Sequence, residues 1–182
     1  MEADKDFMTF WKWSIKGSGG KSGFRRLFNF WILFHIGIGW SLAKIIPADL
    51  STAAATVGLP LVGILIGLAF AWAGNAQALM QSAEIDELAE HHKGGFVDYA
   101  YTYQLAILVI LITIVLWSLA GLGVYDKVWP TVACGSYYFD VKTTLYATSS
   151  LTLRECWHVV LGAQFMLLAQ RRIKKKTAEK EK

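Results

Sequence analysis

The stretch from Leu105 to Leu122 is eighteen residues long and carries no charged side chain. As a helix it would rise about 27 Å, close to the thickness of about 30 Å of a bilayer's hydrocarbon layer. The whole chain is 54% hydrophobic and 18% charged, whereas soluble domains carry about 25% charged residues. We therefore predict an all-α integral membrane protein. Four transmembrane helices, forming an antiparallel bundle, are expected at residues 27–46, 56–73, 105–122 and 151–170.

Two basic clusters set the expected orientation of this bundle. Lysines and arginines that flank membrane spans are retained on the cytoplasmic side. Both termini are therefore expected in the cytoplasm, and we expect a multi-pass protein of a bacterial inner membrane. The acids between the second and third spans count little in this rule. The clusters are Lys12, Lys16, Lys21, Arg25 and Arg26 before the first span, and Arg171, Arg172, Lys174, Lys175 and Lys176 after the last.

The segments outside the spans divide the chain into three parts. Residues 1–26 form a cytoplasmic part, in which Phe7–Ile15 mixes large apolar residues with lysines. That mixture is typical of an amphipathic helix lying at the membrane interface, and the glycines after it predict a hinge. Residues 27–170 form the transmembrane domain, and residues 171–182 form a basic cytoplasmic tail.

Two further structural expectations concern the connections between spans. The residues from Asn75 to His92 contain no proline, so the helix of residues 56–73 is predicted to continue as a cytoplasmic extension as far as residue 93. In the outer loop, Val128–Ala133 and Tyr137–Lys142 are expected to pair as a small hairpin.

Small residues recur at one helical spacing in the second span. Gly63 and Gly67 form a GxxxG pair that Ala71 continues. This spacing lets two helix backbones approach closely and favours helix association in lipid. The partner helix belongs either to the same chain or to another copy in a homo-oligomer, and the sequence leaves both open.

Ionisable residues stand at five positions inside the apolar stretches. In the fourth stretch, Arg154, Glu155 and His158 are expected to border one helix face. In the first, Lys44 is expected near the depth of Glu155, and His35 within about two turns of the depth of His158. Such groups cost a few kcal/mol each at membrane depth, so they face a bundle interior, a partner or water.

The roles of these five residues remain open at this point. Counting back from Arg171 puts Glu155 roughly 25 Å from the cytoplasmic edge, near enough to the outer surface to snorkel. There it could pair with Lys44 or with Arg154 of a neighbouring helix. A structural ion pair, a polar pore and a signalling element are all compatible with the pattern. In a catalytic alternative, His158, Glu155 and Arg154 act as acid, base and anion clamp.

The expected cytoplasmic extension carries a second group of polar residues. A carboxylate and an imidazole four residues apart, as at Glu87 and His91, can share one metal ion. The chain has only four histidines, so a partner-docking face or a solvated helix end is favoured, and we expect no metal and no cofactor. The residues assigned to this face are Glu84, Glu87, Glu90, His91 and His92.

The absence of several known sequence motifs argues against several classes of function. The sequence contains no phosphate-binding, dinucleotide-binding, serine-hydrolase or zinc-protease signature. Thirteen of the eighteen lysines and arginines lie in the two tails, which indicates membrane topology and lipid attraction and not a nucleic-acid groove. Cys134 and Cys156 lack CxxC spacing, and two free thiols are favoured over a disulfide.

The sequence therefore favours a non-enzymatic membrane subunit with no catalytic residues. We expect it to form homo-oligomers and to act as a channel-like component or as an anchor for a cytoplasmic protein. In size and topology the chain resembles the small multi-span subunits that bacteria encode beside cytoplasmic sensors or effectors, including some antiviral systems. A membrane enzyme acting on a lipid and a small-solute transporter subunit remain as alternatives.

Overall fold

The structure is all-helical over the residues that it describes. It is a computed structural model and describes residues 9–16, 23–80, 95–128 and 135–180, among which there is no strand. The short elements are α1 (Phe10–Lys16), α2 (Phe24–Leu27), α4 (Leu50–Ala53), a π-helical turn (Ala54–Gly58) and α8 (Val124–Val128). The long helices are α3 (Trp31–Ile45), α5 (Leu59–Met80), α7 (Gly95–Gly121) and α9 (Gly135–Lys180).

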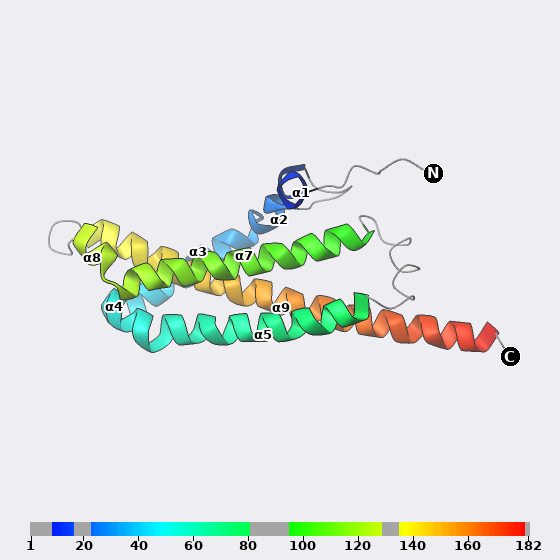
Figure 1. Cartoon of the computed structure of the whole chain (residues 1–182). Helices are drawn as coiled ribbons and strands as arrows, with labels where there is room; N and C mark the ends of the chain where they lie inside the picture. Colours follow the sequence, from blue (N-terminus) through cyan, green and yellow to red (C-terminus); the bar gives the residue numbers. More distant parts are fainter. Residues whose placement is uncertain (1–8, 17–22, 81–94, 129–134, 181–182) are drawn as a thin grey trace.

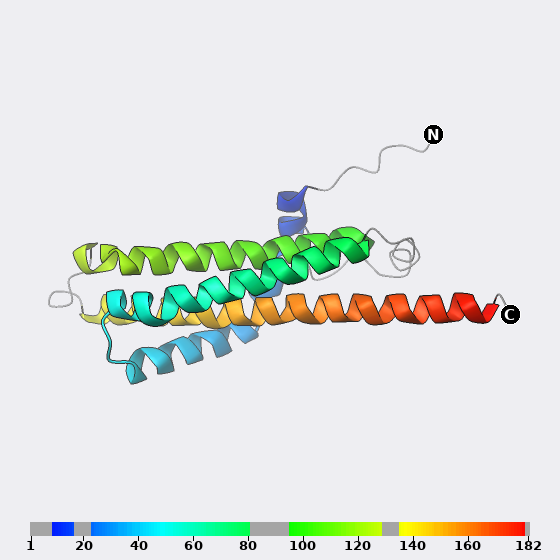
Figure 2. The ribbon, with the colours of Figure 1, turned by 60° about the horizontal axis from the view of Figure 1, so that its bottom comes forward.

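Helix α9 is the central element of the bundle. Helices α3, α5 and α7 all pack along it, and α5 and α7 also pack on each other (Figure 1). Seen from a second direction, α3 lies on the opposite side of α9 from α7 (Figure 2). The bundle therefore consists of three long helices with the shorter α3 packed against the outside of α9.

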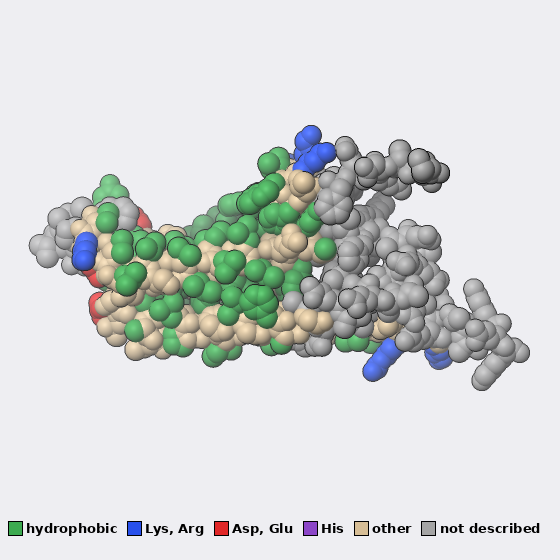
Figure 3. Space-filling model, viewed as in Figure 1, with side chains coloured by type: hydrophobic (Ala, Val, Ile, Leu, Met, Phe, Trp, Pro, Cys, Tyr) green, Lys and Arg blue, Asp and Glu red, His purple; other side chains and the backbone are tan. Residues whose placement is uncertain are grey.

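The two ends of the bundle differ in charge. The N-terminal helix α1, the start of α7 and the C-terminal end of α9 lie at one end (Figure 1). The described basic residues of the tails, such as Lys12, Lys16 and Arg171, belong to these elements. The opposite end, formed by α4, α8 and the start of α9, carries Asp126 and Asp140 together with Lys127 and Lys142, and Figure 3 shows acidic and basic groups there.

Two helices of the described chain are long and apolar enough to cross a membrane. They are Leu50–Ala71 and Ala100–Gly121, each of 22 residues. Only 33% and 39% of their most apolar windows are buried inside the chain, so most of these apolar residues face outward. The spans expected at 56–73 and 105–122 largely coincide with these helices, although the first helix begins six residues earlier, at Leu50.

The other two expected spans differ from the observed helices. The segment 27–46 is not one helix, because α2 ends at Leu27 and α3 begins only at Trp31. The side chain of Asn29 accepts a hydrogen bond from the Trp31 backbone N–H (2.9 Å), so this break satisfies one of the amides at the start of α3. Helix α3 has 15 residues and would rise about 22 Å, which is short for a perpendicular crossing. The segment 151–170 is only the middle of the 46-residue helix α9.

The segments that follow α8 and α5 differ in how well they match the sequence predictions. The hairpin was wrong, because Tyr137–Lys142 belongs to the first turns of α9 and Val128 ends α8. The run of hydroxyl and aromatic residues after Gly135 joins the helix that follows it. Helix α5 continues past residue 73 as far as Met80, and the cytoplasmic location of this extension stays a prediction. Its remainder, with Glu84, Glu87, Glu90, His91 and His92, lies outside the described residues.

Helix α1 docks on the bundle through one face. Trp13 is fully buried, and its ring centroid lies 5.6 Å from that of Tyr101 near the start of α7. Phe10 packs on the same tyrosine at 5.9 Å. The opposite face leaves Trp11 and Ile15 exposed, as expected for a helix that also touches an interface. A short helix at this place is thus confirmed, and part of its apolar surface packs within the chain, while its position at a membrane interface stays a prediction.

The connection between α3 and α4 is fixed by two side chains of α9. Lys142 is buried and donates from Nζ to the backbone oxygens of Ile46 and Ala48, each at 2.9 Å. A cation suits this place because the carbonyls at the end of a helix carry partial negative charge. The hydroxyl of Tyr138 accepts a hydrogen bond from the Leu50 N–H (3.0 Å), and burial raises the pKa of this phenol.

Candidate functional site

A row of hydroxyl side chains along α9 sets the register of the bundle. Thr152 Oγ1 lies 2.8 Å from Thr113 Oγ1 of α7, and Ser149 Oγ accepts from Nε1 of Trp117 at 2.7 Å. The pairs run in opposite directions along the two helices, so α7 and α9 are antiparallel. The hydroxyls of Ser149 and Thr152 also donate to carbonyls four residues earlier, which allows them to be buried.

This register places Arg154 and Glu155 midway along the apolar part of α7. Thr152 stands opposite Thr113, so Glu155 lies near the level of Ile110, which is the middle of the helix Ala100–Gly121. By the same register, Arg171 lies near the level of Gly95, where α7 begins, and α9 continues beyond it to Lys180. The distance of the pair from the outer membrane surface, counted from Arg171, stays a prediction.

Arg154 and Glu155 form an ion pair within one helix. Nε and Nη2 of Arg154 both donate to Oε1 of Glu155, at 2.9 and 2.6 Å. The Glu155 side chain is 1% exposed and that of Arg154 16% exposed, so the pair is largely shielded and the carboxylate does not snorkel. Neighbours in sequence rarely face each other on a helix, and the long arginine side chain makes this contact by folding back.

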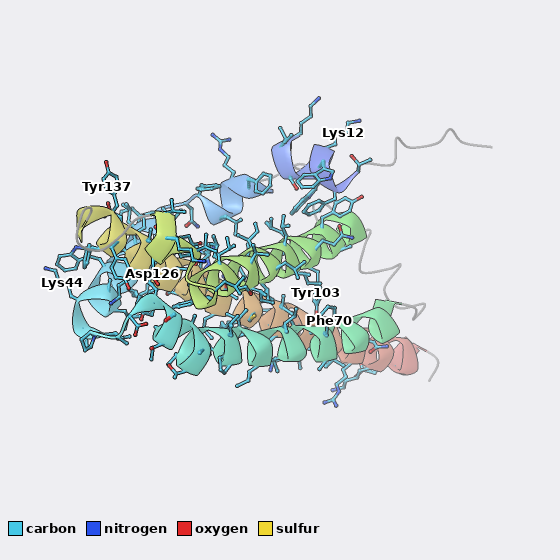
Figure 4. All side chains as sticks on the ribbon, turned by 60° about the vertical axis from the view of Figure 1, so that its left-hand side comes forward. Lys12, Lys44, Phe70, Tyr103, Asp126 and Tyr137 are labelled. Carbon is cyan, nitrogen blue, oxygen red and sulfur yellow. The ribbon has the colours of Figure 1, made fainter. Side chains whose placement is uncertain are left out.

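Two predicted partners of this pair lie elsewhere. Lys44 is exposed and stands over the ring of Trp40, with Nζ 3.7 Å from the ring centroid, so it does not pair with Glu155. Figure 4 shows Lys44 projecting at the α4 end of the bundle. His158 is exposed while Glu155 is buried, so the two do not share one face as expected. That separation weakens the role of His158 in the catalytic alternative.

His35 joins the cluster from α3. It is 5% exposed, and its Nδ1 lies 2.8 Å from Ser150 Oγ of α9. Its other ring nitrogen, Nε2, is buried without a hydrogen-bond partner, and so is Nη1 of Arg154. The sequence identified His35 and Arg154 but missed Ser150. The signal was present in the hydroxyl-rich run from Thr143 to Thr152, which is unusual beside an apolar helix.

An open groove lies over this polar cluster. Its volume is about 630 Å³, and it is bounded by the start of α3, by α5 and by the middle of α9. Helix α3 packs with Gly39 against Thr143 and Ala147 and with His35 against Ser150, so it runs antiparallel to α9 and begins near Arg154. Beyond that level α3 no longer covers α9. The walls are mainly apolar, and they include Trp31, Phe34, Leu65, Leu68, Trp157 and Val160.

Cys156 lies in the lining of this groove as a free thiol. Its sulfur is buried and stands 3.9 Å from the backbone oxygen of Leu65 on α5. A disulfide from Cys156 to the outer loop is therefore absent, in agreement with the favoured expectation for this cysteine, while Cys134 lies outside the described residues. Across the described segments, no three His, Cys, Asp or Glu residues are grouped to hold a metal ion.

Gly63 and Gly67 of α5 lie in open space, whereas Gly39 and Gly58 lie directly against residues of neighbouring helices. A Cβ at Gly58 would overlap the ring of Trp117, and one at Gly39 would overlap the backbone of Thr143. Gly63 and Gly67 have nothing within 4 Å of such a Cβ, and Ala71 is exposed. The GxxxG strip therefore makes no contact within the described chain. The close approaches lie at Gly39 and Gly58, which the sequence did not single out.

The cluster does not have the geometry of a nucleophilic triad. In a nucleophilic triad, one nitrogen of the histidine contacts the nucleophile and a third group orients the other. His35 contacts Ser150 through Nδ1, but Nε2 has no such group. What the site presents instead are two buried nitrogens without hydrogen-bond partners beneath an apolar groove.

Comparisons of the chain with protein-family models, with curated proteins and with solved structures gave no match. The class that the described residues define is an all-helical protein with two helices able to span a membrane.

Proposed function

We propose that this chain is a non-enzymatic membrane subunit that associates with further copies through the outer face of α5. Its four membrane segments are α2–α3, α5, α7 and α9, and both termini lie in the cytoplasm of a bacterial cell. The open strip of Gly63, Gly67 and Ala71 is the single observation that carries the proposal.

The exterior of the bundle supports a membrane environment. Large apolar residues are exposed on every long helix, for example Phe34 on α3, Phe70 on α5, Val115 on α7 and Phe165 on α9. Figure 3 shows apolar side chains spread over the middle of the visible face. Soluble monomers rarely expose contiguous apolar patches of more than a few hundred Å². The basic end then lies in the cytoplasm by the positive-inside rule.

The position of the glycine strip supports association between copies. On α5, Val62, Leu65 and Ala69 are buried against the rest of the chain. Gly63 and Gly67 lie on the opposite side of the same helix, where a second helix can approach the backbone. Because the interior of one chain is filled by residues such as Ile110 and Trp117, any conducting path would run between copies.

Native mass measurement of the detergent-solubilised protein tests the proposal. The wild type should give a defined oligomer, and Gly63→Leu with Gly67→Leu should give mainly monomer with unchanged helix content. Gly37→Leu is the matched control, because Gly37 on α3 also has nothing within 4 Å of an added Cβ. A strictly monomeric wild type, or equal oligomers in all three proteins, would refute the proposal.

A further inference from the structure

The groove over His35 and Arg154 has features that select a ligand. These features do not depend on whether copies of the chain associate. We propose that it binds the ring of a membrane quinone, a neutral lipid-soluble molecule with carbonyl acceptors on a flat ring. The inference uses three properties of the groove: its unpaired nitrogens, its net charge, and its walls and volume.

The two unpaired nitrogens are the first property. His35 Nε2 and Arg154 Nη1 are both buried and without a partner, although buried polar groups normally have one. Ser150 Oγ makes its hydrogen bond to Nδ1 of His35, and when the hydroxyl is the donor the ring proton is on Nε2. Both residues line the groove, so Nη1–H of Arg154 and, in this tautomer, Nε2–H of His35 are available to an acceptor oxygen placed there.

The net charge of the cluster decides which acceptor fits. Arg154 is paired with Glu155 at 2.6 Å, so the two charges cancel, and a neutral His35 adds none. An anionic headgroup would meet no excess positive charge and would have to lose its hydration midway along an apolar helix. A neutral carbonyl oxygen accepts the same hydrogen bonds at a far smaller desolvation cost.

The walls and volume of the groove favour a flat ring with an apolar tail. Trp31 and Phe34 of α3 and Trp157 of α9 line it, and aromatic side chains pack well on planar rings. The aliphatic side chains of Leu65 and Leu68 suit a prenyl chain. The volume of about 630 Å³ lies within the range of small-molecule sites.

Binding of decylubiquinone, a short-chain quinone, to the full chain in lipid nanodiscs tests this proposal. Saturable quenching of tryptophan fluorescence gives the dissociation constant. His35→Phe removes one donor while keeping a ring, and the double variant Arg154→Met with Glu155→Gln removes the other without leaving a lone charge. Each change should weaken binding about tenfold, the loss of roughly one hydrogen bond. Leu33→Ala, an exposed position on α3 outside the groove, should change it less than twofold.

Three results would overturn the assignment. Decylbenzene, which has the tail and ring but no carbonyl, should not compete, and equal competition would make the groove a site for acyl chains. Unchanged affinity for decylubiquinone in both donor variants would also overturn the assignment. If either donor variant loses its helix content, Trp157→Ala replaces it, because Trp157 is 60% exposed and its loss spares the core. That variant should weaken binding several-fold, and unaltered binding would equally overturn the assignment.

Discussion

The Arg154–Glu155 pair allows the energetics of the polar cluster to be predicted in detail. Changing Glu155 to Leu leaves Arg154 largely buried with no carboxylate, since Oε1 of Glu155 accepts both of its described hydrogen bonds. Removing one partner of a buried pair costs about 3–5 kcal/mol, because the remaining charge stays desolvated. The charge that remains is that of Arg154, whose side chain is 16% exposed, so the lower half of this range applies.

Changing both residues together should cost far less. In Arg154→Met with Glu155→Leu, no charge is left buried, and replacement of buried pairs by apolar residues is often neutral or stabilising by about 1–4 kcal/mol. The double variant should therefore be at least as stable as the wild type, and the coupling energy of the cycle should be about 3 kcal/mol or more.

Reversible unfolding in mixed micelles, followed by circular dichroism, measures the four free energies of this cycle. Lys44→Leu serves as the control, because Lys44 is exposed on a cation–π contact and its loss should cost less than about 1 kcal/mol. If Glu155→Leu costs no more than Lys44→Leu, the ion pair is solvated and its placement inside the bundle is wrong.

Three further outcomes follow from other contacts. Gly58→Ala should destabilise by about 1–3 kcal/mol, because its Cβ meets a buried indole, whereas Gly63→Ala should be neutral or slightly stabilising in the same unfolding assay. Lys142→Met should lower the unfolding free energy by about 3 kcal/mol by removing two hydrogen bonds from a charged donor, while Lys127→Met, on the exposed surface of α8, should have no measurable effect. Hydrogen bonds from a hydroxyl and a backbone N–H lower the pKa of Asp49 to about 2, so its contribution to stability is full above about pH 4 and is lost as the pH falls toward 2. The difference in unfolding temperature between wild type and Asp49→Ala should shrink over that interval, and a constant difference would contradict this reasoning.

The sequence predicted the helices whose apolar pattern is uninterrupted. Leu105–Leu122 and the second apolar stretch both lie largely within observed long helices, because local hydropathy decides such segments. The small helix before the first span was also recoverable, since Trp13 and its neighbours form a short apolar face. Its docking on Tyr101 was not, because that contact joins residues far apart in the chain.

The site was only partly predictable from the sequence. Membrane-depth charge marked Arg154, Glu155 and His35 as unusual, and the structure brings these three together. Their level along the bundle could not be deduced, because it depends on the register between α7 and α9, which hydrogen bonds such as Thr113–Thr152 fix. The helix break before Trp31, which leaves the groove open, could not be predicted, because no proline or glycine stands there in the sequence.

Placement of the two bundle ends on opposite sides of a membrane is the most direct test of the proposed membrane subunit. In a variant without the native cysteines, a single cysteine replaces either Lys127 on α8 or Arg172 on α9, both of which are exposed. An impermeant maleimide added to intact cells should modify the cysteine at position 127, while the one at position 172 should react only after lysis. Labelling of position 172 in intact cells, or of neither position until lysis, would contradict the proposed arrangement.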